Sequence, residues 1–289
     1  MKLQPPVRIN SLKKYFHAEN IYPKKSLGQN FIIDIEIINQ IIEIAGLSKD
    51  DEILEIGAGL GTLTMYLAEK VKRVVAIEKD RRLSKELEKS LSEIKNLELY
   101  NEDILQVDLK RFYNENKMKV VSNLPYSISS PILIRLLEKR ELYSLIVIMI
   151  QREVGERIAA KPGGKDYGSL SVLLQTYMEV TIGLRVPSDA FWPKPKVESV
   201  VIKLIPLDRP RIKITHEKLF NKVVRAAFST RRKILGNALS SIFPKDKLNA
   251  ILNSSGIDRT RRAETLSIEE FARITEASAR AIEEFQFPL

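Results

Sequence analysis

The chain has 289 residues, 44% of them hydrophobic and 29% charged, and its formal net charge at pH 7 is +10. This length allows one large domain and one small one, and the positive charge favours a polyanionic partner over a neutral small molecule. The chain has no cysteine and only two histidines, which excludes a disulfide framework, a cysteine-bound metal and a thiol nucleophile. We therefore expect no metal, and catalysis would depend on positioning, amides, carbonyls, carboxylates or an organic cofactor.

The first thirty residues are rich in lysine and arginine and lack a periodic pattern, so we expect residues 1–30 to form a basic arm. No apolar block follows the first residues, and no apolar run is long enough to span a membrane, so we expect a cytoplasmic protein without a membrane segment. Beyond the arm, Asp34 is placed to cap a helix that runs to about Ala45 and stops before Gly46.

Strands and helices alternate from residue 52 to residue 160. The apolar runs predict strands at 52–56, 73–78, 97–100, 119–123 and 145–150, with helices near 61–70, 81–94, 131–140 and 152–160. Alternation of this kind requires right-handed crossovers, which predicts a doubly wound parallel sheet.

The pattern changes after a further predicted helix at 169–177, because two β-rich runs follow at 179–186 and 197–205. The segment between them is too short for a crossover helix, so the two runs are predicted to form an antiparallel hairpin. A parallel sheet that ends in a reversed hairpin is typical of S-adenosylmethionine-dependent methyltransferases. The predicted fold class is therefore α/β, a Rossmann-like class I methyltransferase sheet with a terminal antiparallel hairpin.

Residues 206–210 form a candidate linker, and the pattern beyond it is helical: 216–240, a piece near 245–254, and 267–285, where Ser267 and Glu270 form a capping-box pair. The expected domains are the arm at 1–30, a methyltransferase domain at 31–206 and a small all-helical C-terminal domain at 207–289.

A glycine-rich turn follows the first predicted strand, with Glu55 ahead of Gly57, Gly59 and Gly61. The dinucleotide pattern G-x-G-x-x-G would need glycine where the chain has Thr62, whereas G-x-G-x-G with an acid two residues before it is the methyl-donor form. A structural turn without a ligand is the alternative interpretation.

Carboxylates follow the next two strands. Glu78 is placed to accept both ribose hydroxyls of a cofactor. Asp103 can accept a hydrogen bond from the cofactor adenine, with Ile104 packing on the ring. Solvated acids are the alternative, and the alternative is stronger for Asp103 because Glu102 and Asp108 lie nearby.

The tetrapeptide Asn123-Leu124-Pro125-Tyr126 follows another strand, at the same sheet edge as the glycine turn. The Asn123 side-chain oxygen and the Leu124 carbonyl can accept from an exocyclic amine, Pro125 stiffens the loop, and Tyr126 can stack on a flat base. An adenine amino group fits this set. An ordinary strand-to-helix turn is the alternative.

Phe191 lies in the hairpin loop, which Pro193 and Pro195 hold extended. If the loop folds over the Asn123 edge, Phe191 and Tyr126 can sandwich a flipped-out base. A core aromatic is an equally good interpretation, and Trp192 can take the same place or pack beneath it.

Several motifs occur along the chain in a fixed order: Pro23-Lys24-Lys25-Ser26-Leu27-Gly28-Gln29-Asn30-Phe31, the glycine turn, Asn123-Leu124-Pro125-Tyr126, Gln151-Arg152-Glu153-Val154, Tyr167-Gly168-Ser169-Leu170-Ser171, and Phe191-x-Pro193-x-Pro195-x-Val197-x-Ser199. With them the chain resembles the ribosomal RNA adenine N6,N6-dimethyltransferases over about residues 20 to 285. The resemblance implies S-adenosylmethionine as methyl donor, dimethylation of adenine amino groups in small-subunit ribosomal RNA during ribosome biogenesis, and the small-subunit precursor as partner of a monomer. It also implies that Asn30 and Ile32 join Gly57, Glu78, Asp103 and Asn123 in contacting the cofactor.

Basic residues outside these motifs are the least specific signal, because such residues usually form a solvated surface. Beside an adenine pocket they become a candidate phosphate-binding surface. The candidates are Lys13, Lys14, Lys24, Lys25, Arg225, Arg231, Arg232, Lys233, Arg261 and Arg262, together with Arg259.

Two other functions stay open at this point. A DNA adenine N6-methyltransferase would use the same tetrapeptide, but it would need a domain able to read the major groove. A non-catalytic ribosome-assembly or nucleic-acid-binding factor of the same fold would be expected to have lost the glycine turn or Asn123, and this chain retains both.

Overall fold

The structure is a computed structural model that describes residues 16–17, 21–24, 27–230 and 232–285. The chain divides into two compact units. The first extends to Gly155 and includes Thr181–Pro206, and the second contains Glu156–Val180 and the chain from Leu207 onward. The second unit thus contains 156–180, which the sequence assigned to the methyltransferase domain.

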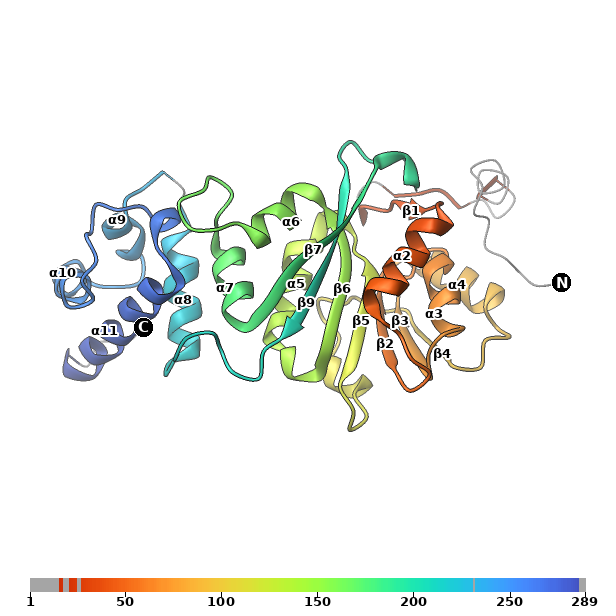
Figure 1. Ribbon diagram of the computed structural model, residues 1–289, viewed down its shortest axis with the longest axis horizontal. Coiled ribbons are helices and arrows are strands. Elements are labelled where there is room, and N and C mark those ends of the chain that lie inside the picture. Colours follow the sequence, from red (N-terminus) through yellow and green to blue (C-terminus); the bar gives the residue numbers. More distant parts are fainter. Residues whose placement is uncertain (1–15, 18–20, 25–26, 231, 286–289) are drawn as a thin grey trace. The chain divides into compact units, whose positions relative to one another are not determined.

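A seven-stranded sheet forms the centre of the first unit, in the order β4-β3-β2-β5-β6-β9-β7 (Figure 1). Pairings from β4 to β6 are parallel, while β9 runs antiparallel to β6, with Ile202 opposite Ile148. This confirms a mostly parallel, doubly wound sheet, in which the reversed strand β9 lies between β6 and the edge strand β7. The strands are β2 Glu52–Ile56, β3 Arg73–Ile77, β4 Leu97–Tyr100, β5 Met118–Asn123, β6 Tyr143–Gln151, β7 Met178–Val186 and β9 Ser199–Pro206.

The central strands β2 and β6 are almost fully buried, as expected for parallel strands covered on both faces. All five residues of β2 are buried, and β6 exposes only Ser144 among its first eight residues. The covering helices of this unit are α2 Ile35–Ala45, α3 Thr62–Ala68, α4 Arg81–Ser90 and α5 Ser129–Glu138, with short 3-10 turns at Leu109–Phe112, Tyr126–Ile128, Arg140–Leu142 and Ser188–Ala190.

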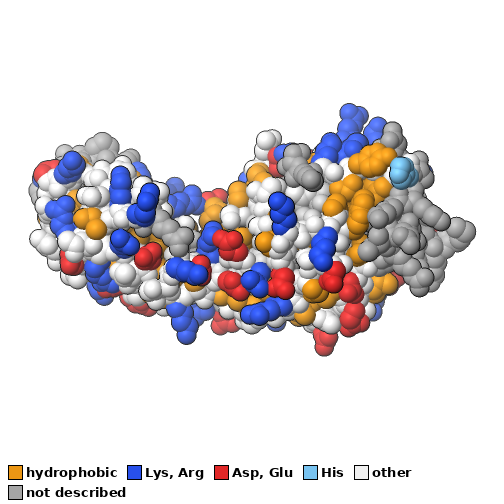
Figure 2. All heavy atoms as spheres, turned by 90° about the horizontal axis from the view of Figure 1, so that it is seen from above, with side chains coloured by type: hydrophobic (Ala, Val, Ile, Leu, Met, Phe, Trp, Pro, Cys, Tyr) orange, Lys and Arg blue, Asp and Glu red, His pale blue; other side chains and the backbone are white. Residues whose placement is uncertain are grey.

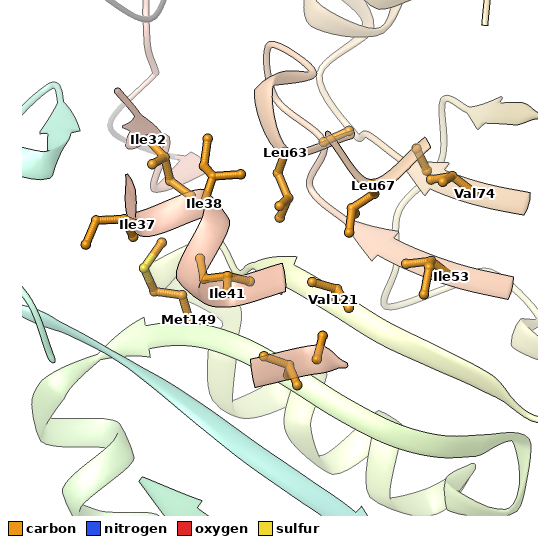
Figure 3. Packing of buried hydrophobic residues seen from close by; sticks show 14 of the residues in the cluster. Ile32, Ile37, Ile38, Ile41, Ile53, Leu63, Leu67, Val74, Val121 and Met149 are labelled. Atoms are coloured by element: carbon orange, nitrogen blue, oxygen red, sulfur yellow. The ribbon is translucent and has the colours of Figure 1, made fainter. Parts of the chain in front are cut away.

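Helix α2 forms as its sequence predicts. The Asp34 carboxylate accepts hydrogen bonds from the Glu36 and Ile37 amides, and Gly46 ends the helix at φ 51°. Ile38 and Ile41 then point into a core with Leu67 of α3 (Figure 3). This core also contains Ile53, Val74, Val121 and Met149 of the sheet, so α2 and α3 cover the same face.

A second, two-stranded sheet was not predicted. Strand β1, Phe31–Ile32, pairs antiparallel with β8, Phe191–Trp192. Phe16 packs on the rings of Phe31 and Trp192, with centroid separations of 5.5 and 4.9 Å. The chain just before α2 is thereby fixed to the loop between β7 and β9.

The second unit is helical. Its helices are α7 Ser169–Tyr177, α8 Glu217–Ala227, α9 Leu235–Leu239, α10 Lys245–Ser254 and α11 Ile268–Phe285, with a 3-10 turn at Ala263–Thr265, while α6, Arg152–Ala159, crosses the boundary between the units. The capping-box pair is confirmed, because the Ser267 amide donates to the Glu270 carboxylate and the Glu270 amide donates to the Ser267 hydroxyl.

The single helix predicted at 216–240 is wrong, because it is interrupted between Ala227 and Leu235. The Ser229 hydroxyl donates to the Ala226 carbonyl, and the Lys233 amide donates to the Thr230 carbonyl. The Ser229 side chain thus competes for a carbonyl of the helical ladder, and the backbone bond between Lys233 and Thr230 closes a turn after the helix. None of the helices in the described ranges is long and apolar enough to cross a membrane.

Candidate functional site

A cavity lies at the carboxyl ends of β2, β3 and β5 in the first unit. Strand β2 stands between β3 and β5, so this edge is the topological switch point at which α/β sheets bind ligands. The structure brings most of the predicted site residues to its wall: Asn30, Ile32, Glu55, Gly57, Gly59, Glu78, Asp103, Ile104, Asn123, Leu124, Pro125 and Tyr126. Gly61 and Phe191 do not line it.

The glycine turn needs glycine for two different reasons. Gly57 has φ +76°, and a Cβ there would lie 3.3 Å from two ring atoms of Pro125, so the glycine turn and the Asn123–Tyr126 loop are in contact. Gly61 has φ +77°, and its Cβ would lie 2.6 and 2.7 Å from Leu87 and Leu91. Gly61 therefore lets α4 pack closely and is not part of the cavity wall.

Glu78 is buried directly after β3, and its carboxylate is hydrogen-bonded to the glycine turn and to the turn that precedes α4. One carboxylate oxygen accepts from the Gly59 amide at 2.9 Å, and the other accepts from the Asp80 amide at 2.7 Å. Burial raises the pKa of Glu78 although these hydrogen bonds oppose the shift. Each oxygen can still accept a second hydrogen bond, so the carboxylate can receive hydroxyl donors from a ligand.

Glu55 is a second buried carboxylate on the same wall. Its Oε2 atom has no hydrogen-bond partner in the described part of the chain. Burial raises the pKa of Glu55 to about 8, the Thr64 hydroxyl opposes the shift, and the charge of Glu78 adds to it. Such a group is satisfied by a ligand that brings a positive charge or a hydrogen-bond donor.

Asp103 is ion-paired and is not a solvated loop acid. Lys79 Nζ lies 2.7 Å from its carboxylate, and the Leu105 amide donates to it at 2.9 Å. The hydrogen bond from Lys79 holds the pKa of Asp103 below its usual value. Ile104 is buried beside it, so the wall here offers an anionic acceptor next to an apolar surface.

Asn123, the last residue of β5, presents an acceptor to the cavity. Its Nδ2 atom donates to the Asn30 carbonyl at 2.9 Å. Its Oδ1 atom is buried and has no hydrogen-bond partner among the described residues. The Leu124 amide donates to the Met149 carbonyl at 3.0 Å, which fixes the start of the loop to β6.

Tyr126 and Phe191 are close, but they do not form two parallel walls. Their ring centroids are 6.4 Å apart and their planes meet at 71°, and only 2% of Phe191 is exposed. The Tyr126 hydroxyl is hydrogen-bonded to the hydroxyl of the buried Ser199 at the start of β9. Ser199 is the last residue of the Phe191–Ser199 motif, but no separate role was predicted for it.

Asp80 is a residue that the sequence analysis missed. Its carboxylate accepts from the Gln29 amide at 3.2 Å and from Arg82 Nη2 at 2.7 Å, and Lys24 Nζ lies 3.7 Å away. Burial alone would raise the pKa of Asp80, but the hydrogen bonds from Arg82 and Gln29 lower it to about 2. The Lys24 amide also donates to Gln29 at 2.7 Å. Asp80 thus ties Lys24 and Gln29 to the start of α4, beside the cavity.

The predicted phosphate-binding residues differ in their exposure and in their contacts. Lys13, Lys14, Lys25 and Arg231 lie outside the described residues. Arg225, Arg232, Lys233 and Arg262 are exposed in the second unit, whereas Arg261 is held by two hydrogen bonds to Glu270, at 2.6 and 3.0 Å. Figure 2 shows lysine and arginine side chains spread over the visible face with acidic ones among them.

The sequence matches the family model described as ribosomal RNA adenine dimethylase over residues 22–280. It is 46% identical over 264 residues to the ribosomal RNA small subunit methyltransferase A of Bacillus cereus (strain B4264), an alignment that covers 88% of this chain and 90% of the relative. The fold is similar to that of a dimethyladenosine transferase from Plasmodium falciparum, with a TM-score of 0.71 and 27% identity, over 86% of this chain and 97% of the other. It is also similar to the 23S rRNA methyltransferase ErmE, with a TM-score of 0.62 and 26% identity, over 86% and 98% of the two chains.

We expect Asp80→Asn to weaken the attachment of Lys24 and Gln29 to the start of α4. Asparagine still caps α4, so the helix should persist, while the charge that holds Arg82 and Lys24 is lost. Because these two partners are partly exposed, the cost should be about 1–2 kcal/mol. Trypsin should then cleave after Lys24 roughly tenfold faster than in the wild type. Asp34→Asn, which changes the cap of α2 alone, is the control, and equal cleavage rates for both variants would contradict the role of Asp80.

We expect Glu55→Gln to change how stability depends on pH. Between pH 4.5 and about 8 the folded protein keeps a proton on Glu55 that the unfolded chain releases. The contribution of Glu55 to stability is therefore fully present below the unfolded-state pKa of 4.5 and is lost as the pH rises through the folded-state pKa of about 8. Glutamine does not titrate, so the melting temperature of the wild type should fall relative to the variant between about pH 5 and pH 9. If the melting temperatures of the wild type and Glu55→Gln changed in parallel with pH, the shift of the Glu55 pKa would be refuted. Glu69→Gln, at an exposed site, is the control variant.

Proposed function

This chain belongs to the ribosomal RNA adenine dimethylase family, and we propose that it transfers two methyl groups from S-adenosylmethionine to the N6 amino group of adenines in small-subunit ribosomal RNA. The observation that carries the proposal is the Asn123 amide. Its nitrogen is engaged by Asn30, and its buried oxygen has no hydrogen-bond partner among the described residues. An adenine amino group supplies the hydrogen that this oxygen lacks.

The cavity residues fit S-adenosylmethionine as the methyl donor. Glu78 can accept the ribose hydroxyls, Asp103 can accept the adenine amino group with Ile104 on the ring, and the backbone at Gly57 and Gly59 allows close approach. Asn30 and Ile32 would complete the wall from the N-terminal side. The unpartnered Oε2 atom of Glu55 supports a ligand with positive charge. Once bound, this cofactor supplies an electrophilic methyl group.

In the first transfer Asn123 and Leu124 would activate the adenine by accepting its two amino hydrogens. In the second transfer one of them would accept the single hydrogen of the monomethylated amine, and each transfer releases one amine proton to water. The lone pair of an adenine amine is delocalised into the ring, so the amine is a poor nucleophile. Two acceptors favour a pyramidal nitrogen whose lone pair is free, and they stabilise the positive charge that grows as the nitrogen is methylated. Holding both reactants in line contributes roughly 7–11 kcal/mol in such reactions. Pro125, in contact with the glycine turn, would keep these acceptors in place.

Tyr126 would stack on the flipped-out adenine, and stacking offsets the unstacking cost of a few kcal/mol. Its hydrogen bond to Ser199 supports one ring orientation. The role proposed for Phe191 as a second wall requires its ring to turn from its present angle of 71° to Tyr126. In its present position Phe191 is a core residue that packs edge to face with Tyr126.

The exposed cations of the second unit, Arg225, Arg232, Lys233 and Arg262, would contact the RNA backbone, with the basic arm as a further contact. The two alternative functions have no observation in their favour. Two of the relatives are named as ribosomal RNA methyltransferases, and both the glycine turn and Asn123 are in place.

Asn123→Ala tests the chemistry. At saturating donor we expect the rate of methyl transfer to fall by about a hundredfold or more, while RNA affinity stays close to that of the wild type. The measurement is transfer of tritiated methyl groups to unmodified small ribosomal subunits, followed by nucleoside analysis for dimethyladenosine. Asn237→Ala, at an exposed position of the second unit, is the control. A near-normal rate in Asn123→Ala would rule out its role, and transfer by the wild type to duplex DNA alone would rule out the RNA assignment.

Glu78→Gln tests the donor site. The amide keeps one acceptor oxygen but places a donor against the Gly59 or Asp80 amide, so we expect donor affinity to fall about tenfold to a hundredfold. Isothermal titration with S-adenosylmethionine measures the change, and the melting temperature without donor shows whether the glycine turn survives. Glu93→Gln, at an exposed carboxylate, should bind normally. Unchanged affinity in Glu78→Gln would remove the ribose contact from the proposal.

A further inference from the structure

The second unit contains a cavity of its own, with a volume of about 260 Å³. It lies among the start of α7, the end of α8 with the turn that follows, and Ala263–Glu264. One buried water needs only about 10–15 Å³, so this space can hold a polar group much larger than water. No step of the proposed reaction uses it.

Two hydroxyls in the wall of this cavity have no hydrogen-bond partner among the described residues. Tyr167 is 4% exposed, its ring packs edge to face on Phe228 at a centroid separation of 6.0 Å, and its hydroxyl is unpartnered. Burial, with smaller effects from Glu269 and Glu270, raises the pKa of Tyr167, so the phenol stays a donor. Thr230 Oγ1 is likewise buried and unpartnered. A buried hydroxyl without a partner costs about 1–3 kcal/mol, a cost that a bound acceptor would remove.

The N-terminus of α7 borders the same space. Gly168, Ser169 and Leu170 line the cavity, and α7 runs for nine residues from Ser169. The Gly168 amide donates to Ser171 Oγ at 2.9 Å. The next amides belong to the first turn of the helix, where the backbone has no partner within the helix and carries partial positive charge. Helix starts of this kind bind anions.

The charged groups at the cavity point to the same kind of ligand. Three cationic side chains line it, Arg157, Lys165 and Lys233, against two carboxylates, Asp166 and Glu264. A metal cation would meet more positive than negative charge here, and the hydroxyls and amides offer it donors. An oxyanion bound here would be stabilised by the cationic side chains, the hydroxyl donors and the amides at the helix start.

We propose that this cavity binds one phosphate group of the ribosomal RNA backbone, with the hydroxyls of Tyr167 and Thr230 and the first amides of α7 donating to its oxygens. The assignment of the phosphate to RNA rests on the proposed function. The phosphate chemistry rests on the cavity alone. Lys165 and Lys233 supply charge at the rim, and the buried hydroxyls hold the phosphate in one position.

Tyr167→Phe removes the hydroxyl and keeps the ring against Phe228, so the fold should persist. Tyr177→Phe is a matched control, because Tyr177 lies on α7, packs edge to face on Phe220 at 6.4 Å and does not line the cavity. Thr230→Val is a second variant of similar shape. Without ligand, the melting temperatures of full-length Tyr167→Phe and Thr230→Val should equal or exceed that of the wild type, because the hydroxyl that each loses has no hydrogen-bond partner among the described residues, and that of Tyr177→Phe should stay close to it.

The first measurement is thermal stabilisation by inorganic phosphate at constant ionic strength. Phosphate should stabilise the wild type and Tyr177→Phe but not Tyr167→Phe. The second is affinity for small-subunit ribosomal RNA, which should fall about tenfold in Tyr167→Phe and in Thr230→Val and stay unchanged in Tyr177→Phe. At saturating RNA the methyl-transfer rate and donor affinity of Tyr167→Phe should equal those of the wild type.

Equal stabilisation of Tyr167→Phe and the wild type by phosphate would overturn the site. Loss of stabilisation with unchanged RNA affinity would overturn the RNA assignment and leave a site for free phosphate. If the wild type transferred no methyl groups to ribosomal RNA, the proposed function would fail, whereas the phosphate measurement would still decide the chemistry of the cavity.

Discussion

The hydrogen bond from the Asn123 amide to the Asn30 carbonyl decides what the first cavity can do. An amide side chain has a donor end and an acceptor end, and the carbonyl can take only the donor, so the oxygen is left for the ligand. The position of Asn30 depends in turn on its neighbours. Gln29 is held by Asp80, and Phe31 is paired with Trp192 in the small sheet. Three segments distant in sequence, residues 29–32, the start of α4 and the β7–β9 loop, therefore set the orientation of one side chain.

The same cavity contains two acids, Glu55 and Glu78, whose burial disfavours their charged forms. Glu55 and Glu78 are both buried and both have raised pKa values, and the charge of Glu78 adds to the shift of Glu55. Hydrogen bonds from two backbone amides offset part of the desolvation cost of Glu78, but the Oε2 atom of Glu55 accepts no hydrogen bond from the described residues. A cationic ligand bound here would relieve both the burial and the repulsion. Ligand binding and stability of the first unit should therefore be linked.

Local patterns predicted the parts of this fold that depend on local physics. The alternation of apolar runs indicated the parallel sheet, Asp34 and Gly46 marked the ends of α2, and the acids and amides after successive strands came together because parallel strands end at one edge. Contacts between distant residues were not predictable. The β1–β8 pairing is two residues long, Tyr126 meets Ser199 across 73 positions, and neither has a periodic signal. The break after Ala227 was missed because apolar residues recur at helical spacing on both sides of it, whereas the hydrogen bond from the Ser229 hydroxyl to the Ala226 carbonyl has no periodic signal.

The division of the chain limits how its activities can be separated. The chain passes from one unit to the other three times, after Gly155, after Val180 and after Pro206. A chain ending near Pro206 would keep Tyr167 and Tyr177 but lose Phe228 and Phe220, the rings on which they pack. Residues 156–180 would then expose apolar surface that they bury in the full chain. The proposed binding of the methyl donor and of RNA would thus be better separated by substitutions at Arg232 and Arg262, the surface cations proposed to contact RNA, which leave both cores intact, than by removing the C-terminal helices.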